Sequence, residues 1–188
     1  MSIEDRVAAI RSHYQSFFSG HKTTTESWET GPINAVIPGF EVFRAAPGPA
    51  INLWTYCSVG ACRLWHDKSG LMEFAILAAE QNRRIVELLA MTAHYHASHD
   101  LGFGDSLPIG EPWLLGSLCD HWLVSKPYPL GPEFEICNVG DTHVHVAWML
   151  PITESERDFK MVQGVEALEQ RFEDVGLEYW DVDRQTVV

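Results

Sequence analysis

The pattern of apolar and polar positions is clearest between residues 143 and 172. Residues 143–150 alternate, which predicts a β-strand with one face on the core and a ladder that ends at Pro151. The side chains expected to face the core are Val144, Val146, Trp148 and Leu150.

Two helices are predicted to follow this strand. Thr153 and Glu156 have the spacing of a capping box, in which a hydroxyl and a carboxylate each satisfy a backbone N–H at the start of a helix. Gly164 is the residue type that ends a helix in left-handed backbone. A second apolar stripe begins at Val165, and Gly176 is expected to stop it.

Helical spacing recurs in two earlier stretches, residues 3–18 and residues 80–99, and Ser2 is the expected N-cap of the first. Residues 71–77 are nearly all apolar apart from Glu73, which predicts a central strand covered on both faces. The turn at residues 67–70 predicts a hairpin with the strand before it.

The other predicted strands are short, at residues 40–45, 52–59 and 134–139. Residues 105–132 contain five prolines between apolar islands, so short edge strands separated by turns are expected there. Residues 21–39 are polar and then rich in Gly and Pro, which is typical of a connecting segment.

About six strands and four helices follow one another without strict alternation. This order predicts an α/β fold of the mixed α+β kind, with a central mixed β-sheet flanked by helices. The chain has 188 residues, so one domain over residues 1–188 is expected. It would consist of an N-terminal helix (1–20), the connecting segment (21–39) and a sheet-and-helix body (40–188).

The formal net charge is −13. It argues against binding to nucleic acid, which needs Lys and Arg against phosphate, and against anionic membranes. Net charge of this size keeps a protein soluble, and it can also steer a basic partner toward the surface.

Neither a signal peptide nor an apolar run long enough for a membrane helix is evident in the sequence, so we expect a cytoplasmic protein. The four cysteines have no CxxC spacing and are expected to be partly buried and reduced. They are Cys57, Cys62, Cys119 and Cys137.

Nine histidines raise the alternative of a metal site. His143 and His145 share a strand face, and Asp120 and His121 are the candidate third ligands. A second group is His94, His96 and His99 on the predicted helix, of which His96 and His99 can share a face. No metal-binding motif such as HExxH is present, so exposed histidines are the simpler interpretation.

The cysteines, the acidic cluster and the tryptophans also give no clear sign of a catalytic site. Cys57 and Cys119 do not form a recognisable Cys–His pair in the sequence. The acids Glu154, Glu156 and Asp158 are explained by the capping box and the helix dipole. Four tryptophans are expected mainly in the core, with a few as exposed interface anchors. They are Trp54, Trp65, Trp113 and Trp122.

Several segments together resemble the suppressor of fused (Sufu-like) domain family. They are WTYCSVG, LMEFAIL, PIGEPW, HVAWMLPITESERDF with the following GVEALEQRF, and the closing DVDRQTVV. The resemblance covers roughly residues 28–188. It implies a mixed α/β domain with a protein-binding role and no catalytic residues. Animal members sequester zinc-finger transcription factors, whereas single-domain bacterial members look like immunity proteins that neutralise toxins. This chain resembles the bacterial type because it is short.

The expected function is therefore that of a non-enzymatic protein-binding domain, an immunity-type protein whose partner is a basic toxin domain. The alternative is a metal-dependent enzyme that uses His143 and His145, and a third hypothesis is a structural subunit of an assembly. No cofactor is expected. The sequence assigns no catalytic, metal or partner-binding residues.

Overall fold

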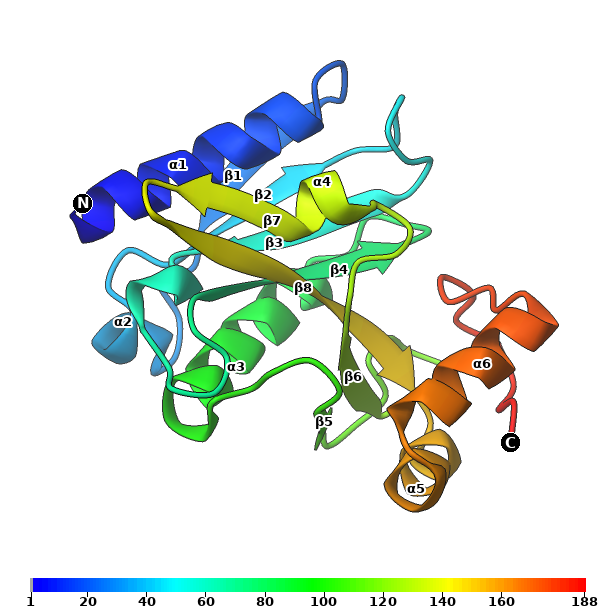
Figure 1. The fold of residues 1–188 in the computed structure, drawn as a ribbon. Helices are drawn as coiled ribbons and strands as arrows, with labels where there is room; N and C mark the ends of the chain where they lie inside the picture. The colour runs from blue at the N-terminus through cyan, green and yellow to red at the C-terminus, as the bar shows by residue number, and fades with distance from the viewer. Residues whose placement is uncertain (1) are drawn as a thin grey trace. The chain divides into compact units, whose positions relative to one another are not determined.

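The computed structural model describes residues 2–188, which form eight strands, six α-helices and one short 3-10 helix (Figure 1). The helices are α1 (Ile3–Phe17), α2 (Ile33–Val36), α3 (Arg84–His99), α4 (Pro132–Glu135), α5 (Glu154–Gln163) and α6 (Val165–Val175), with the 3-10 helix η1 at Ala61–Arg63. The strands are β1 (Thr23–Ser27), β2 (Glu41–Ala45), β3 (Trp54–Val59), β4 (Met72–Ala78), β5 (Ser106–Pro108), β6 (His121–Ser125), β7 (Ile136–Val139) and β8 (Thr142–Ile152).

The described strands belong to one mixed sheet. Its order is β1-β2-β3-β4-β8-β6-β5, and β7 pairs with β8 off this path. Strands β1 to β4 are antiparallel neighbours, whereas β4 and β8 run parallel, with Met72 opposite His145. The predicted fold class, a mixed α/β fold with a central mixed sheet, is confirmed, and so is the hairpin between β3 and β4.

The chain divides into two compact units. Unit 1 runs to Phe103 and resumes at Lys126–Trp148, and unit 2 consists of Gly104–Ser125 and Met149–Val188. Strand β8 contributes its first part to unit 1 and its last part to unit 2. That residues 1–188 act as a single domain stays a prediction.

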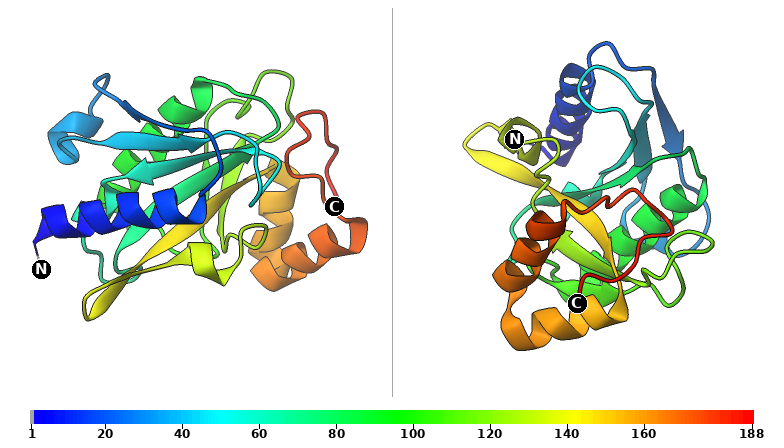
Figure 2. Two further views of the ribbon diagram at one scale, coloured as in Figure 1. Left: turned by 90° about the horizontal axis from the view of Figure 1, so that it is seen from above. Right: turned by 90° about the vertical axis from the view of Figure 1, so that its right-hand side faces the viewer.

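In unit 1, helices α1 and α3 lie on opposite faces of the sheet (Figure 2). On one face, the ring of Tyr14 lies 5.5 Å from the ring of Phe43. On the other, the ring of His96 lies 5.1 Å from that of Phe74. Every residue of β4 is buried, so the predicted central strand is confirmed.

Three predictions in unit 1 need correction. The connecting segment 21–39 contains β1 and α2. The sequence of β1, TTTES, has no apolar alternation, because this strand is exposed and is held by pairing with β2. The strand expected at 134–139 begins only at Ile136, after the single turn of α4. Helix α3 begins at Arg84, whereas the sequence predicted a start at residue 80.

Unit 2 contains β5, β6, the end of β8, and the two C-terminal helices. The capping box is observed, since Thr153 Oγ1 accepts from Glu156 N and Glu156 Oε2 accepts from Thr153 N. Gly164 ends α5 and Gly176 ends α6, as predicted. Gly176 has the left-handed conformation (φ 60°, ψ 56°), but Gly164, at φ 92° and ψ 162°, does not adopt the one expected for it. In the proline-rich segment, β5 and β6 form, but β6 lies between β8 and β5 instead of at an edge, and residues 113–115 form no strand.

The prediction that Pro151 ends the β8 ladder is wrong, because the strand continues to Ile152. Proline lacks a backbone donor and normally disrupts a ladder. Here the Pro151 carbonyl accepts a hydrogen bond from Nη2 of Arg184 at 2.8 Å. A side chain from the C-terminal tail therefore satisfies the Pro151 carbonyl.

Candidate functional site

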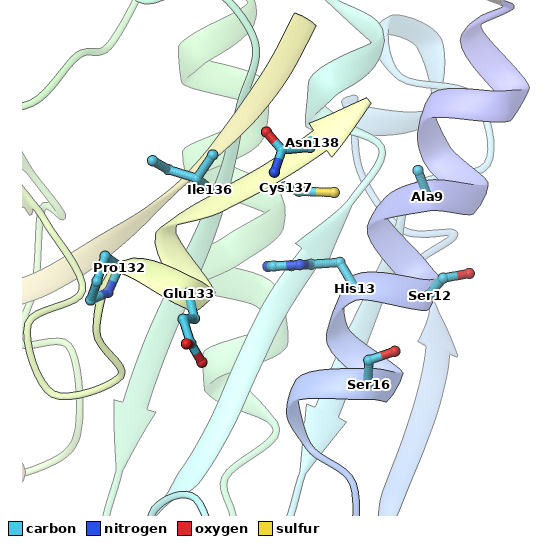
Figure 3. A pocket seen from close by; sticks show the side chains of 9 residues that line it. All are labelled: Ala9, Ser12, His13, Ser16, Pro132, Glu133, Ile136, Cys137 and Asn138. Carbon is cyan, nitrogen blue, oxygen red and sulfur yellow. The ribbon is translucent and has the colours of Figure 1, made fainter. Parts of the chain in front are cut away.

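A groove in unit 1 runs between one face of α1 and the segment formed by α4 and β7 (Figure 3). Its volume is about 850 Å³. The residues that line it are Ala9, Ser12, His13, Ser16, Pro132, Glu133, Ile136, Cys137 and Asn138. The α1 residues recur at steps of three and four, so they come from a single helix face.

The groove is lined by one histidine, one cysteine and several small or polar side chains. His13 Nε2 donates to the Phe134 carbonyl oxygen at 2.9 Å, which anchors the ring against α4. Burial raises the pKa of the Cys137 thiol to about 11, which leaves little thiolate. Among the nine lining residues, no hydrogen bond joins a nucleophile to a base. The walls offer exposed serine, asparagine and glutamate side chains to a polar ligand.

His143 and His145 lie side by side on β8, with ring centroids 4.7 Å apart. His145 Nδ1 is 3.5 Å from Glu135 Oε1. Burial, with the neighbouring His143, lowers the pKa of His145. His145 also lines a cavity of about 380 Å³ together with Lys68 and Lys126, whose ammonium groups disfavour a bound cation.

The structure gives the metal hypothesis no support. Within residues 2–188, no three His, Cys, Asp or Glu side chains are grouped so that they could hold a metal ion. The proposed third ligands, Asp120 and His121, bind each other instead, with His121 Nδ1 2.8 Å from Asp120 Oδ1.

The three histidines of α3 lie in three different environments. His94 lines an apolar pocket of about 370 Å³ with Trp28 and Met91. His96 is buried, and His99 is exposed and stacks on Tyr95 with ring centroids 3.8 Å apart. His96 and His99 therefore do not form a common site.

His96 instead pairs with a histidine that the sequence analysis did not single out. Its ring centroid lies 4.2 Å from that of His66. His96 Nδ1 accepts from Leu101 N at 3.0 Å, so the neutral tautomer carries its proton on Nε2. Burial, together with the nearby His66, lowers the pKa of His96 to about 4.

Glu73 is a second buried group that the sequence marked only as an exception in an apolar strand. Its carboxylate accepts hydrogen bonds from Ser58 Oγ, Gly60 N at 2.8 Å and Cys62 N at 3.1 Å. Burial raises its pKa, and these donors oppose the shift. Ser58 belongs to β3, Gly60 to the turn after it and Cys62 to η1, so Glu73 fixes the connection from β3 into η1.

The cysteines are poor nucleophiles. All four are free and buried. Burial raises the pKa of Cys119 to about 11 and that of Cys57 well above its usual value. Reactive cysteines need the opposite environment, with cations nearby and access to solvent.

The acids at the start of α5 are structural, as the capping box predicts. Arg157 pairs with Glu154 at 3.3 Å and with Asp158 at 2.9 Å. Glu156 is buried and also binds Arg184, a partner 28 positions away that local sequence patterns could not reveal.

The tryptophans divide as expected between core and surface. Trp113 and Trp122 are buried with ring centroids 6.0 Å apart. Trp54 is half-buried beneath Arg44, and Trp65 is 64% exposed.

Comparison with known proteins assigns the family. The model of the suppressor of fused protein (SUFU) family matches residues 38–185. The chain belongs to the suppressor of fused family. The resemblance seen in the sequence is thereby confirmed over most of the chain.

Solved suppressor of fused structures agree with this assignment. A homologue from Neisseria gonorrhoeae FA 1090 is 32% identical, with a TM-score of 0.87 and 98% of each chain covered. The Sufu–Fu complex structure matches with a TM-score of 0.72 at 14% identity, covering 96% of this chain and 91% of that chain. Drosophila Suppressor of Fused matches with a TM-score of 0.70 at 14% identity, covering 96% of this chain and 50% of that one. No protein with a curated description matches this suppressor of fused domain.

The two more distant structures show that the suppressor of fused fold persists at low identity. Among the described residues of this chain, no helix is both long enough and apolar enough to cross a membrane.

Proposed function

We propose that this suppressor of fused domain is a non-enzymatic, immunity-type protein that binds a basic protein partner, a toxin domain, and neutralises it. The observation that carries the proposal is the placement of negative charge. Unit 2 contains 13 acidic and 4 basic residues, a net charge of −9, whereas unit 1 contains 13 acidic and 9 basic residues, a net charge of −4.

Charge concentrated in this way attracts an oppositely charged protein. Complementary potentials raise the rate of encounter and discriminate against partners of the same sign. The strongest basic surfaces among toxins belong to enzymes that act on nucleic acid, because these enzymes must bind phosphate. A nuclease domain therefore fits the charge of unit 2.

Two further observations support the proposal. A relative with the same fold has been solved as the Sufu–Fu complex, so that protein binds another protein. The buried thiols and the anchored His13 leave the candidate site with a surface for binding and no activated nucleophile. Four free cysteines also fit a reducing, cytoplasmic location.

The proposal is tested by capture and by rescue. The tagged chain is incubated with lysate of the cell that encodes it, and captured proteins are identified by mass spectrometry. We expect a basic domain that kills cells when expressed alone and is tolerated when this chain is co-expressed. A captured partner that is acidic, or one whose toxicity co-expression does not relieve, would contradict the proposal.

A further inference from the structure

One loop of unit 2, residues 110–120, presents leucines to solvent from a rigid frame; we call it the leucine loop. Its ends are joined by two backbone hydrogen bonds, from Ile109 N to Asp120 O at 2.8 Å and from Trp113 N to Cys119 O at 2.9 Å. The loop is therefore closed like a hairpin, although it contains no strand.

Buried side chains fix the interior of the leucine loop. Trp113 is buried, and its Nε1 donates to Ser117 Oγ at 3.1 Å. The same hydroxyl accepts from Cys119 N at 3.1 Å. Ser117 N in turn donates to Leu114 O at 3.1 Å. This network restricts the tip between Leu114 and Ser117, because Ser117 is bonded to the buried indole and to the backbone on both sides of it.

Two leucines of this hydrogen-bonded loop are exposed to solvent. Leu115 is 101% exposed and Leu118 is 54% exposed. Isolated exposed apolar residues are common on protein surfaces. Two leucines on one hydrogen-bonded loop are different, because the backbone that carries them is already ordered, and binding does not have to order it again.

Acidic residues lie on the leucine loop and on the C-terminal turn that approaches its tip. A β-carbon at Gly116 would lie 4.0 Å from Asp183 Oδ1, so the C-terminal turn approaches the tip of the loop. Asp181 belongs to the same turn, since its Oδ1 accepts from Asp183 N at 3.0 Å. Glu111 and Asp120 lie on the loop itself.

The four basic residues of unit 2 each have a partner within the unit. Arg184 is buried on Glu156, and Arg157 pairs with Glu154 and Asp158. Lys160 Nζ donates to the Gly104 carbonyl oxygen, and the guanidinium of Arg171 lies over the ring of Phe159. Within unit 2, whose net charge is −9, the leucine loop itself carries two acidic residues and no Lys or Arg.

We infer that the leucine loop and the Asp181–Asp183 turn form the docking surface for a basic protein that carries an apolar recess within a Lys- and Arg-rich surface. This inference rests on the proposed function and gives it a location. Leu115 and Leu118 enter the recess, and the carboxylates of the Asp181–Asp183 turn pair with the basic side chains around it. A second copy of this chain does not fit, because its own net charge of −13 would set acid against acid.

The test compares three tagged proteins in the same lysate capture. They are the wild type, the double variant Leu115→Ser/Leu118→Ser, and the matched control Met161→Ser/Val162→Ser. The control removes two apolar side chains of α5 that are 69% and 78% exposed, in the same unit but outside the leucine loop. Circular dichroism and thermal unfolding establish that all three proteins are folded.

We expect the loop variant to retain at most about a tenth of the captured basic protein, and the control to retain nearly all of it. Equal capture by all three proteins would overturn the leucine loop as the docking surface while leaving the proposed function intact. Capture of no basic protein by the wild type would remove the proposed function itself. A wild-type dimer in sedimentation that the loop variant abolishes would show that a second copy occupies the loop, and would overturn the inference.

A second set of variants separates charge from apolar contact. Asp183→Asn removes one carboxylate beside Gly116, and Glu173→Gln removes one exposed carboxylate of α6. Both change the net charge equally. The inference predicts a larger loss of capture for Asp183→Asn, whereas equal losses would mean that only the overall charge matters.

Discussion

Glu156 of α5 and Arg184 of the C-terminal tail form a buried, bidentate ion pair. Arg184 Nη1 lies 2.8 Å from Glu156 Oε1, and Nη2 lies 2.7 Å from Oε2. The same carboxylate caps α5 through Thr153 N and binds Val187 N. One carboxylate thus joins the helix start to the last residues of the chain.

Replacing Arg184 by Met is expected to lower the free energy of unfolding by about 3–5 kcal/mol, because it leaves the Glu156 carboxylate buried without its cation. Urea denaturation of purified protein measures the change. Arg171→Met is the control, since Arg171 is exposed. The double variant Arg184→Met/Glu156→Met should lose less than the two single losses combined, and simple additivity would argue against direct coupling.

Glu73 supports a second prediction. Glu73→Ala leaves Gly60 N and Cys62 N without their acceptor and opens a space in a buried strand, so we expect a loss of about 3 kcal/mol or more. Glu73→Gln keeps one carbonyl acceptor and should lose less. Chemical denaturation provides the comparison, and Glu80→Ala at an exposed position is the control. Equal losses for Ala and Gln would show that the hydrogen bonds do not matter.

His96 predicts a pH dependence. Its pKa is about 4 in the folded protein and about 6.5 in the unfolded chain, so the unfolded chain binds more protons between these values. The free energy of unfolding contributed by this group is therefore constant above pH ~6.5 and falls, by up to about 3 kcal/mol, as the pH drops toward 4.

Unfolding measured from about pH 7 to about pH 4 tests this slope. His96→Leu should flatten it, whereas His99→Gln, which changes an exposed histidine, should not. An unchanged slope in His96→Leu would mean that another group controls acid stability.

Gly164, between α5 and α6, has φ 92° and ψ 162°, a conformation that is almost restricted to glycine. Gly164→Ala is expected to destabilise the fold by about 1–3 kcal/mol through backbone strain, because no atom would clash with the new methyl group within 4 Å. Thermal unfolding checks this, with Gln163→Ala as the neighbouring control. A neutral Gly164→Ala would show that the two helices can re-orient at no cost.

The parts of the fold that the sequence predicted are those that local chemistry determines. The strand β8, the capping box at Thr153 and the stops at Gly164 and Gly176 depend on residues within a few positions of one another. The one-sided burial expected for β8 holds only at its start, because Ala147 and Met149 on the other face are buried as well. Strand β1 was missed because three threonines carry no apolar pattern and only pairing with β2 makes them a strand. Pro151 was misjudged because its carbonyl is satisfied by Arg184, 33 positions later.

In the candidate site, too, the sequence predicted contacts between neighbouring residues and missed contacts between distant ones. The sequence identified His143 and His145 as neighbours on one strand face, and the structure places them together. It could not show the ammonium groups of Lys68 and Lys126 around the His145 cavity, which come from distant segments. Nor did it reveal the leucine loop, because exposure of Leu115 depends on the burial of Trp113 beneath it.

The central claim is that a basic protein binds this acidic domain through electrostatic attraction. It is tested most directly by the association rate between the purified chain and the captured partner, measured by stopped-flow fluorescence at increasing salt. We predict one-to-one binding whose association rate falls at least about tenfold between ~20 mM and ~300 mM salt, because screening shortens the reach of the charges. A rate that does not change with salt would contradict the claim.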